Sequence, residues 1–207
     1  MTTKQWVRIT PEGVVLNGER LTTTAQGAAL LTELYRARVN DYPKFFKMDE
    51  LSKLGFIASE LILQADGDRH QDSEDRAVIL FNRSSSICND RKYQKTIQYA
   101  EDYFPSPALF VYTLPNIVSG EIAIRNGYYG ETMFYVLDEH DEDLMRATLE
   151  ASFLDKSTKS AICGWLDCED KDHFEAYICL IEISFRILKT YCIIVFRFLF
   201  AEIENND

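Results

Sequence analysis

The sequence from Phe104 to Gly130 reads FPSPALFVYTLPNIVSGEIAIRNGYYG. Its Pro-Ser-Pro opening breaks any helix that precedes it, because proline lacks the amide hydrogen and its ring clashes with the previous turn. The apolar run Ala108–Tyr112 is interpreted as a strand. Asn116 is a favourable helix cap and Gly127 a favourable helix stop, so the residues between them are predicted to form a helix. This helix carries two small residues that would let a second backbone approach closely, Gly120 and Ala123.

Short apolar runs alternate with helical patterns on both sides of this stretch. The continuous run Ala77–Phe81 suits a strand that is buried on both faces. Asp141–Leu154 is predicted to be a helix with Leu144, Met145, Leu149 and Phe153 facing inward. Alternation of this kind predicts an α/β layered fold, with one sheet flanked by helices. Strands are expected near five positions, Ala77, Ala108, Thr132, Ile162 and Tyr177.

The N-terminal third predicts a hairpin followed by two helices. Trp6–Ile9 and Val14–Leu16 are the expected strands of the hairpin, joined by a Pro-Glu-Gly turn. A short helix is expected over Ala28–Arg38, and Pro43 is expected to start a longer one. The longer helix has an apolar stripe at helical spacing, made of Leu51, Leu54, Ile57, Ala58 and Leu61. The polar stretch Asp66–Asp75 is interpreted as a solvated loop.

Composition limits the classes of function. The chain has 207 residues, of which 46% are hydrophobic, enough for one sizeable core. Its net charge of -11 argues against a nucleic-acid partner, because phosphate binding needs clustered lysine and arginine. Met1–Arg8 is polar and gives no secretory signal, so a reduced, cytoplasmic protein is expected. Its cysteines are interpreted mostly as small core residues: Cys88, Cys163, Cys168, Cys179 and Cys192.

Residues 1–183 are expected to form one domain, and residues 184–207 an atypical tail. No acidic residue lies between Ser184 and Ala201, although the chain is otherwise rich in acidic residues. The longest uncharged stretch of this tail, Thr190–Phe196, is too short for a transmembrane span, which takes roughly 20 residues. Three interpretations stay open: the last strand and helix of the core, an amphipathic helix on a membrane or partner surface, or an altered reading frame.

The stretch quoted above resembles the β-ketoacyl synthase N-terminal domain, a thiolase-like family. The resemblance lies in a Ser-Pro pair, a Pro-Asn pair, a small-residue helix that ends in glycine, and a second glycine at Gly130. Pro43–Leu63 is similar to the early helix of that family, and Arg76–Ser86 to its strand and polar turn. The likeness is close over Asp41–Gly130 and looser onward to Ile183. It implies one half of a thiolase-type α/β layer and, in active members, acyl transfer of the 3-oxoacyl-ACP synthase type.

The resemblance also shows what this chain lacks. In the family, the strand after the second glycine leads to an Ala-Cys pair whose thiolate lies at a helix N-terminus. Here the matching strand, Glu131–Leu137, leads into the acidic run Asp138–Asp143, which includes Glu139 and has no cysteine. These carboxylates would oppose thiolate formation, but they suit the positive end of a helix. The family's two catalytic histidines belong to its C-terminal half, which 207 residues are too few to contain, and none of His70, His140 and His173 has a matching context.

The resemblance therefore implies a non-catalytic partner subunit of the chain-length-factor or scaffold type, in fatty-acid, polyketide or aryl-polyene biosynthesis. Its expected partner is a ketosynthase-like protein or a second copy of the chain, with acyl carrier protein contacted only indirectly. No cofactor and no catalytic residue are expected. An aromatic and β-branched strand, Thr132–Val136, suits a paired sheet edge. The interface candidates are Asn116, Gly120, Ala123, Phe134 and Tyr135.

Alternative functions stay open at this point. The chain would be an acyltransferase with a non-standard site, such as Glu139 with His140, active only with a partner, or else a decayed fragment with no role. His140 among carboxylates suggests either a metal site or, as we favour, a solvated acidic helix start. Cys88 in a polar turn is either a reactive thiol or, as we favour, an ordinary loop cysteine.

Overall fold

The computed structural model of the chain describes residues 1–154 and 156–183. A sheet of seven strands runs through it in the order β3-β2-β1-β7-β6-β4-β5. The strand β4 is parallel to its two neighbours, β5 and β6, and the remaining pairs are antiparallel. The bounds are β1 (Thr2–Thr10), β2 (Gly13–Leu16), β3 (Glu19–Arg20), β4 (Arg76–Asn82), β5 (Thr132–Val136), β6 (Ser160–Cys168) and β7 (Phe174–Glu182).

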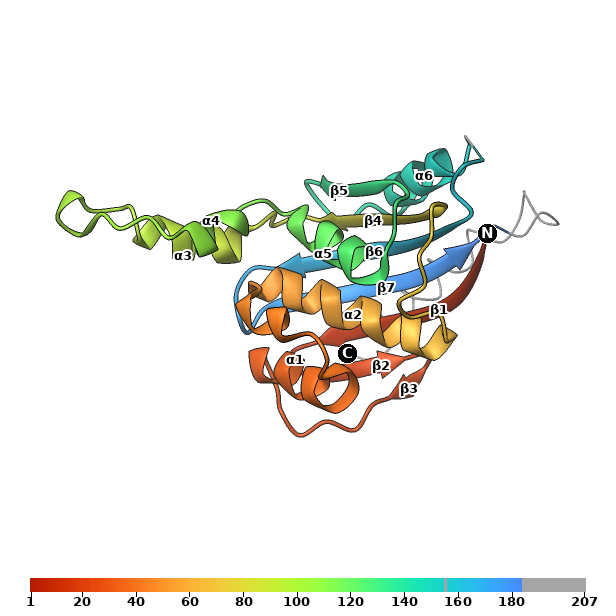
Figure 1. Cartoon of the computed structure of the whole chain (residues 1–207), viewed down its shortest axis with the longest axis horizontal. Coiled ribbons are helices and arrows are strands. Elements are labelled where there is room, and N and C mark those ends of the chain that lie inside the picture. Colours follow the sequence, from red (N-terminus) through yellow and green to blue (C-terminus); the bar gives the residue numbers. More distant parts are fainter. Residues whose placement is uncertain (155, 184–207) are drawn as a thin grey trace.

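Helices lie on both faces of this sheet. Figure 1 shows α1, α2 and α5 on one face and α6 on the other, which confirms the α/β layered fold. The bounds are α1 (Ala28–Leu34), α2 (Glu50–Asp66), α3 (Ile87–Lys95), α4 (Pro107–Val111), α5 (Ile117–Asn126) and α6 (Glu142–Ser152). Short turns of other helix types cover Tyr35–Val39, Pro43–Lys47 and Ala100–Asp102.

The strand β4 lies at the centre of the core, and all seven of its residues are buried. Val78 and Leu80 pack in the cluster formed with α2 and α5, whereas Ile79 and Phe81 pack in the cluster formed with α6. This arrangement confirms that the apolar run is a strand covered on both faces. The expected strands near Thr132, Ile162 and Tyr177 are confirmed as well, as β5, β6 and β7.

The expected strand near Ala108 is wrong, because this segment is the short helix α4. The side chain of Ser106 accepts a hydrogen bond from the amide of Leu109 at 3.3 Å, and Pro107 follows it in the first turn. Serine before proline is a helix start signal. It outweighs the apolar composition of a run that is too short to distinguish strand from helix.

Two helix details also differ from expectation. Pro43 opens only a short 3₁₀ turn, and the long helix α2 starts after Asp49, whose carboxylate accepts from the amide of Ser52 at 3.0 Å. On α6, Met145 is buried as expected, but Leu144 is 47% exposed.

Figure 1 shows α3 and α4 projecting beyond the end of β4, where they form an arm (residues 87–111). Exposed aromatic side chains gather there, namely Tyr99, Tyr103, Phe104 and Phe110. Within the described ranges, no helix is long and apolar enough to cross a membrane. The tail at residues 184–207, with its three interpretations, lies outside the described residues.

Candidate functional site at the edge of strand β5

The strand β5 has β4 on one side and, among the described residues, no strand on the other. Two hydrogen bonds fix which peptide groups face the open side. The amide of Val78 donates to the carbonyl of Glu131 at 2.8 Å, and the amide of Leu137 donates to the carbonyl of Asn82 at 2.7 Å. Since a residue's amide and carbonyl point to the same side of a strand, odd-numbered residues of β5 face β4. Even-numbered residues, Thr132, Phe134 and Val136, therefore present their backbone groups to the open edge.

The side chains of β5 are only partly used by the chain's own core. Phe134 is half-buried against the cluster on the α2 side. Tyr135 stacks on Phe81 on the α6 side, with ring centroids 5.2 Å apart and an interplanar angle of 18°. Met133 and Val136 are 39% and 50% exposed. Among residues 1–154 and 156–183, no other strand pairs with the outer backbone groups of this apolar edge, which is the type of edge that pairs with another chain.

The helix α5 lies beside this edge, and it has the expected bounds. Gly127 ends it in the left-handed conformation, with φ of 68°, while Asn116 occupies the N-cap position without a side-chain cap hydrogen bond. A side chain at Gly120 would meet no atom within 4 Å. Ala123, in contrast, lies in the chain's own core. The outer surface of α5 therefore carries Gly120 together with Ile124, which is 72% exposed.

The close approach between helices occurs at a glycine that sequence reasoning missed. A Cβ atom at Gly55 of α2 would lie 2.4 Å from Cγ2 of Val118 on α5 and 2.9 Å from Cδ2 of Leu166 on β6. Gly55 thus lets α2 pack against α5. Its signal in the sequence was a glycine inside an apolar helical pattern, which usually marks a packing constraint.

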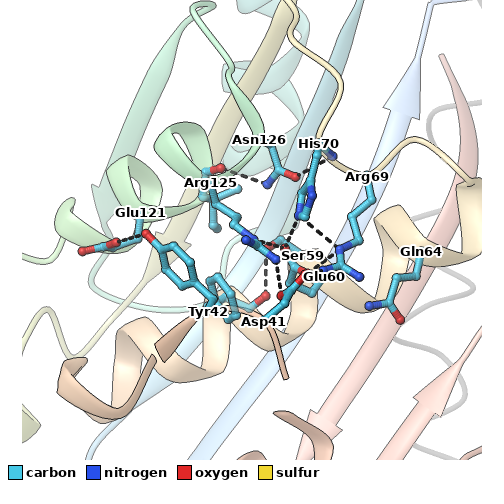
Figure 2. A network of polar contacts seen from close by, with 12 residues as sticks. Asp41, Tyr42, Ser59, Glu60, Gln64, Arg69, His70, Glu121, Arg125 and Asn126 are labelled. Carbon is cyan, nitrogen blue, oxygen red and sulfur yellow. Dashed lines mark hydrogen bonds and ion pairs between the residues drawn. The ribbon is translucent and has the colours of Figure 1, made fainter. Parts of the chain in front are cut away.

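A buried ionic network also ties α5 to α2, and it is drawn in Figure 2. The carboxylate of Glu60, on α2, is fully buried. It pairs with Nε of Arg69 at 2.7 Å and with Nε of Arg125, on α5, at 3.3 Å. Asp41 also pairs with both arginines, with a terminal guanidinium nitrogen of Arg69 at 2.7 Å and with Arg125. A buried carboxylate is tolerated only when cations pair with it, so these contacts determine where α5 lies.

Further contacts extend the same network. The guanidinium of Arg125 lies 4.8 Å from the ring centroid of Tyr42. Lys44 pairs with the buried Glu121 of α5 at 2.7 Å. Burial and the positive charges of Arg125 and Arg69 hold the pKa of His70 below its ordinary value. The expectation that Asp66–Asp75 is only a solvated surface loop is therefore incomplete, because Arg69 and His70 belong to this network (Figure 2).

The junction that follows β5 holds no cysteine. Asp141 caps α6, and its carboxylate accepts from the amide of Leu144 at 2.9 Å. Glu142 and Asp143 occupy the first turn, where the helix dipole favours negative charge. The ring of His140 packs edge-on against Trp165 at 4.8 Å, and burial lowers the pKa of this histidine. Over residues 1–154 and 156–183, no group of three or more His, Cys, Asp or Glu side chains is placed to hold a metal ion.

The described cysteines lie in two pairs, which the sequence did not predict. Cys163 and Cys179 face each other across β6 and β7 with their sulfurs 3.6 Å apart. Cys88 lies in the first turn of α3 rather than in a loop, and it is buried. A hydrogen bond with Cys168 holds the pKa of Cys88 below its ordinary value, while the same bond and burial raise the pKa of Cys168.

Comparison with known proteins identifies the fold. No family model and no curated protein matches the sequence. Among solved structures, a chain of the ishigamide ketosynthase/chain length factor superposes with a TM-score of 0.61 and 17% identity, over 90% of this chain and 63% of that one. The ketosynthase ApeO in complex with its chain length factor ApeC, from Xenorhabdus doucetiae, gives a TM-score of 0.53 and 12% identity, over 89% and 81%.

A third structure, AntDE:AntF, is a type II PKS acyl-carrier protein in complex with its ketosynthase bound to the hexaketide. It gives a TM-score of 0.56 and 12% identity, over 87% of this chain and 63% of that one. The chain therefore has the ketosynthase and chain-length-factor fold that the resemblance predicted. It spans less than two thirds of the ishigamide chain that it matches.

Proposed function

We propose that this chain is a non-catalytic partner subunit of a ketosynthase, of the chain-length-factor or scaffold type. It serves fatty-acid, polyketide or aryl-polyene-type biosynthesis in the cytoplasm, and it binds its partner along β5 and the outer surface of α5. The single observation that carries the proposal is the β5–α6 junction. On this fold, an acidic, capped helix start occupies the place where the resemblance implies a nucleophilic cysteine.

The open edge of β5 supports the site of binding. Thr132, Phe134 and Val136 have backbone groups directed away from β4, and Met133 and Val136 expose apolar side chains beside them. The outer surface of α5 continues this apolar region with Ile124 and leaves room at Gly120. An added strand would satisfy the backbone groups, and alternate side chains would supply specificity.

A proline at Val136 tests the proposal without disturbing the sheet. The amide of Val136 faces the open edge, so Val136→Pro removes a donor that only a partner strand uses, and proline is tolerated on edge strands. We expect wild type to form a complex with a ketosynthase encoded in the same genome, and Val136→Pro to lose at least about tenfold in affinity, as one or two strand hydrogen bonds predict. Sedimentation velocity of the mixtures measures both.

Val136→Thr is the matched control, because it keeps the amide and nearly the same shape. It should bind like wild type, and both variants should unfold at the wild-type temperature. Full binding by Val136→Pro would contradict the assignment of this edge. The alternative function, an acyltransferase active only with its partner, predicts in addition that an acyl group transfers covalently to this chain.

A further inference from the structure

The thiols of Cys88 and Cys168 meet where the arm joins the body of the molecule. Cys88 is the second residue of α3, and Cys168 is the last residue of β6. Both belong to the core cluster on the α2 side of the sheet, and a hydrogen bond joins the two thiols. The thiol of Cys168 also lies 3.4 Å from the carbonyl oxygen of Asp170. The proposed binding along β5 and α5 does not involve this pair of thiols.

The surroundings of Cys88 favour its thiolate, which is the form that reacts with oxidants. The residue lies in the first turn of α3, where the free backbone amides favour negative charge. The hydrogen bond from Cys168 has the largest influence and lowers the pKa of Cys88, and Lys92, one helical turn further along α3, lowers it too. Burial and the carboxylates of Glu50 and Asp49 act in the opposite direction, and Glu50 accepts from the thiol at 3.8 Å. The balance leaves the pKa of Cys88 below its ordinary value.

The second pair of cysteines is an internal reference, because its sulfurs are also close together. Cys163 and Cys179 have their sulfurs 3.6 Å apart, in the middle of β6 and β7 and in the cluster formed with α6. Buried thiols in apolar surroundings are inert. Cys88 is the most exposed of the four described cysteines, at 7% against 1% to 2% for the others. Proximity is therefore common to both pairs, whereas Cys88 adds a favoured thiolate and some access from solvent.

We propose that Cys88 and Cys168 form a dithiol site that a peroxide oxidises to a disulfide, and that this bond fixes the start of α3 to the end of β6. The Cys88 thiolate attacks one oxygen of hydrogen peroxide, the O–O bond breaks, and the leaving hydroxide takes up a proton to become water. Cys88 is then a sulfenic acid. The thiol of Cys168 gives up its proton as its sulfur attacks the sulfenic sulfur, the S–O bond breaks, and a second water molecule leaves. Two thiols and one peroxide thus give one disulfide and two water molecules, with two electrons passing from the sulfurs to the peroxide.

Intact mass spectrometry of the full chain tests the inference, in a Cys192→Ser background so that the cysteine of the tail takes no part. The folded chain is treated with hydrogen peroxide near neutral pH, then denatured and alkylated. We expect the chain to lose two hydrogen atoms, and peptide mapping should place the bond between Cys88 and Cys168. Cys88→Ser should abolish the bond, whereas Cys163→Ser, the matched control, should keep it. Cys168→Ser should leave Cys88 as a sulfenic acid, which dimedone traps.

The rate of oxidation separates a favoured thiolate from mere proximity. Lys92→Met removes a positive charge beside Cys88, so the disulfide should form up to about tenfold more slowly, since one pKa unit changes the thiolate fraction tenfold. Lys95→Met, on the same helix, is the matched control and should react at the wild-type rate.

Three results would contradict the inference. A bond between Cys163 and Cys179, or a treated chain whose thiols all remain free, would overturn it. A sulfenic acid that persists on Cys88 while Cys168 is present would overturn it as well, because the second step would then fail. Equal rates for Lys92→Met and Lys95→Met would overturn the choice of Cys88 as the attacking thiol. Binding to a ketosynthase is measured separately, so none of these results decides the proposed function.

Discussion

Gly55 and Gly120 lie on neighbouring helices, but the space beside Gly55 is filled by other side chains, whereas the space beside Gly120 is empty. A methyl group at Gly55 would collide with Val118 and Leu166, whereas one at Gly120 would meet nothing. We therefore expect Gly55→Ala to lower the free energy of unfolding by about 1–3 kcal/mol through overpacking. Gly120→Ala should raise it by about 0.5–1 kcal/mol through helix propensity. Urea unfolding of the isolated chain measures both.

Gly120→Ala also separates folding from binding. If a partner backbone approaches α5 there, the added methyl group weakens the complex even though it stabilises the isolated chain. A variant that is less stable than wild type would contradict the open environment of Gly120.

The buried carboxylate of Glu60 depends on its neighbouring cations, Arg69 and Arg125, to offset the cost of burying its charge. Arg125→Ala would leave its buried carboxylate with one cation fewer, and we expect a loss of about 3–5 kcal/mol in the free energy of unfolding. Arg146→Ala is the control. It removes an arginine from the exposed pairs with Asp143 and Glu150, which should contribute about 0–1 kcal/mol. Equal losses for the two variants would show that the buried network does not stabilise the contact between α2 and α5.

The roles of some single residues could be predicted from the sequence, and those of others could not. Gly127 was predicted as a helix stop, because its local signal is specific. Gly55 and Glu60 could not be assigned, since their roles come from α5 and from the loop at Arg69, and α5 begins about 60 residues further along the chain. Ala123 was an interface candidate, but it lies in the chain's own core. Which face of α5 turns toward the sheet decides this, and the sequence of the helix alone does not show that face.

Among the elements, the arm is attached to the body by an ion pair at its root. Lys92 of α3 pairs with Glu50 of α2, and Glu50 also accepts from the thiol of Cys88 at 3.8 Å. Burial alone would raise the pKa of Glu50, but the hydrogen bond and charge of Lys92 more than offset it, so this pKa lies below its ordinary value. A depressed carboxyl pKa stabilises the fold above the unfolded value of 4.5, and the contribution is lost as pH falls through the folded value.

We therefore expect Lys92→Met to lower the free energy of unfolding by about 1 kcal/mol near pH 7, and to have a smaller effect as the pH falls below 4.5 and through the folded pKa of Glu50. Chemical denaturation at several pH values measures this difference. Lys95→Met, on an exposed position of the same helix, should change little at either pH. An effect of Lys92→Met that does not depend on pH would contradict the assigned ion pair.

The elements also show where pattern reading succeeds. The strand at Ala77–Phe81 was predicted correctly, because the run is flanked by polar segments and every residue in it is apolar. Such a run suits a strand that is buried on both faces. Ala108–Tyr112 has similar composition but follows a Ser-Pro cap and forms a helix. The β5 strand was predicted and was expected at a sheet edge, where it lies, but the order of the other strands was not predicted, because strand order depends on crossovers that periodicity does not encode.

At the scale of the whole molecule, one sheet has β5 at one end, and within the part of the chain that the structure describes no strand or helix covers the edge of that strand (Figure 1). The apolar strand and the outer surface of α5 both belong to this one end. The sequence predicted the layers from local composition, whereas the expected loss of the nucleophile rests on the resemblance to the β-ketoacyl synthase N-terminal domain. It could not predict the ionic network, which brings together distant segments, or the pairing of Cys163 with Cys179, which depends on the register of β6 and β7.

The central claim is that the chain assists an acyl-transferring partner and takes no acyl group itself. Intact mass spectrometry of both subunits, after a complex of this chain with a ketosynthase from the same genome is incubated with acyl-loaded carrier protein, tests it most directly. The ketosynthase should gain the mass of the acyl group, and this chain should keep its own mass, as should its Cys88→Ala and Cys163→Ala variants. An acyl adduct on this chain that disappears with Cys88→Ala or Cys163→Ala would contradict the claim.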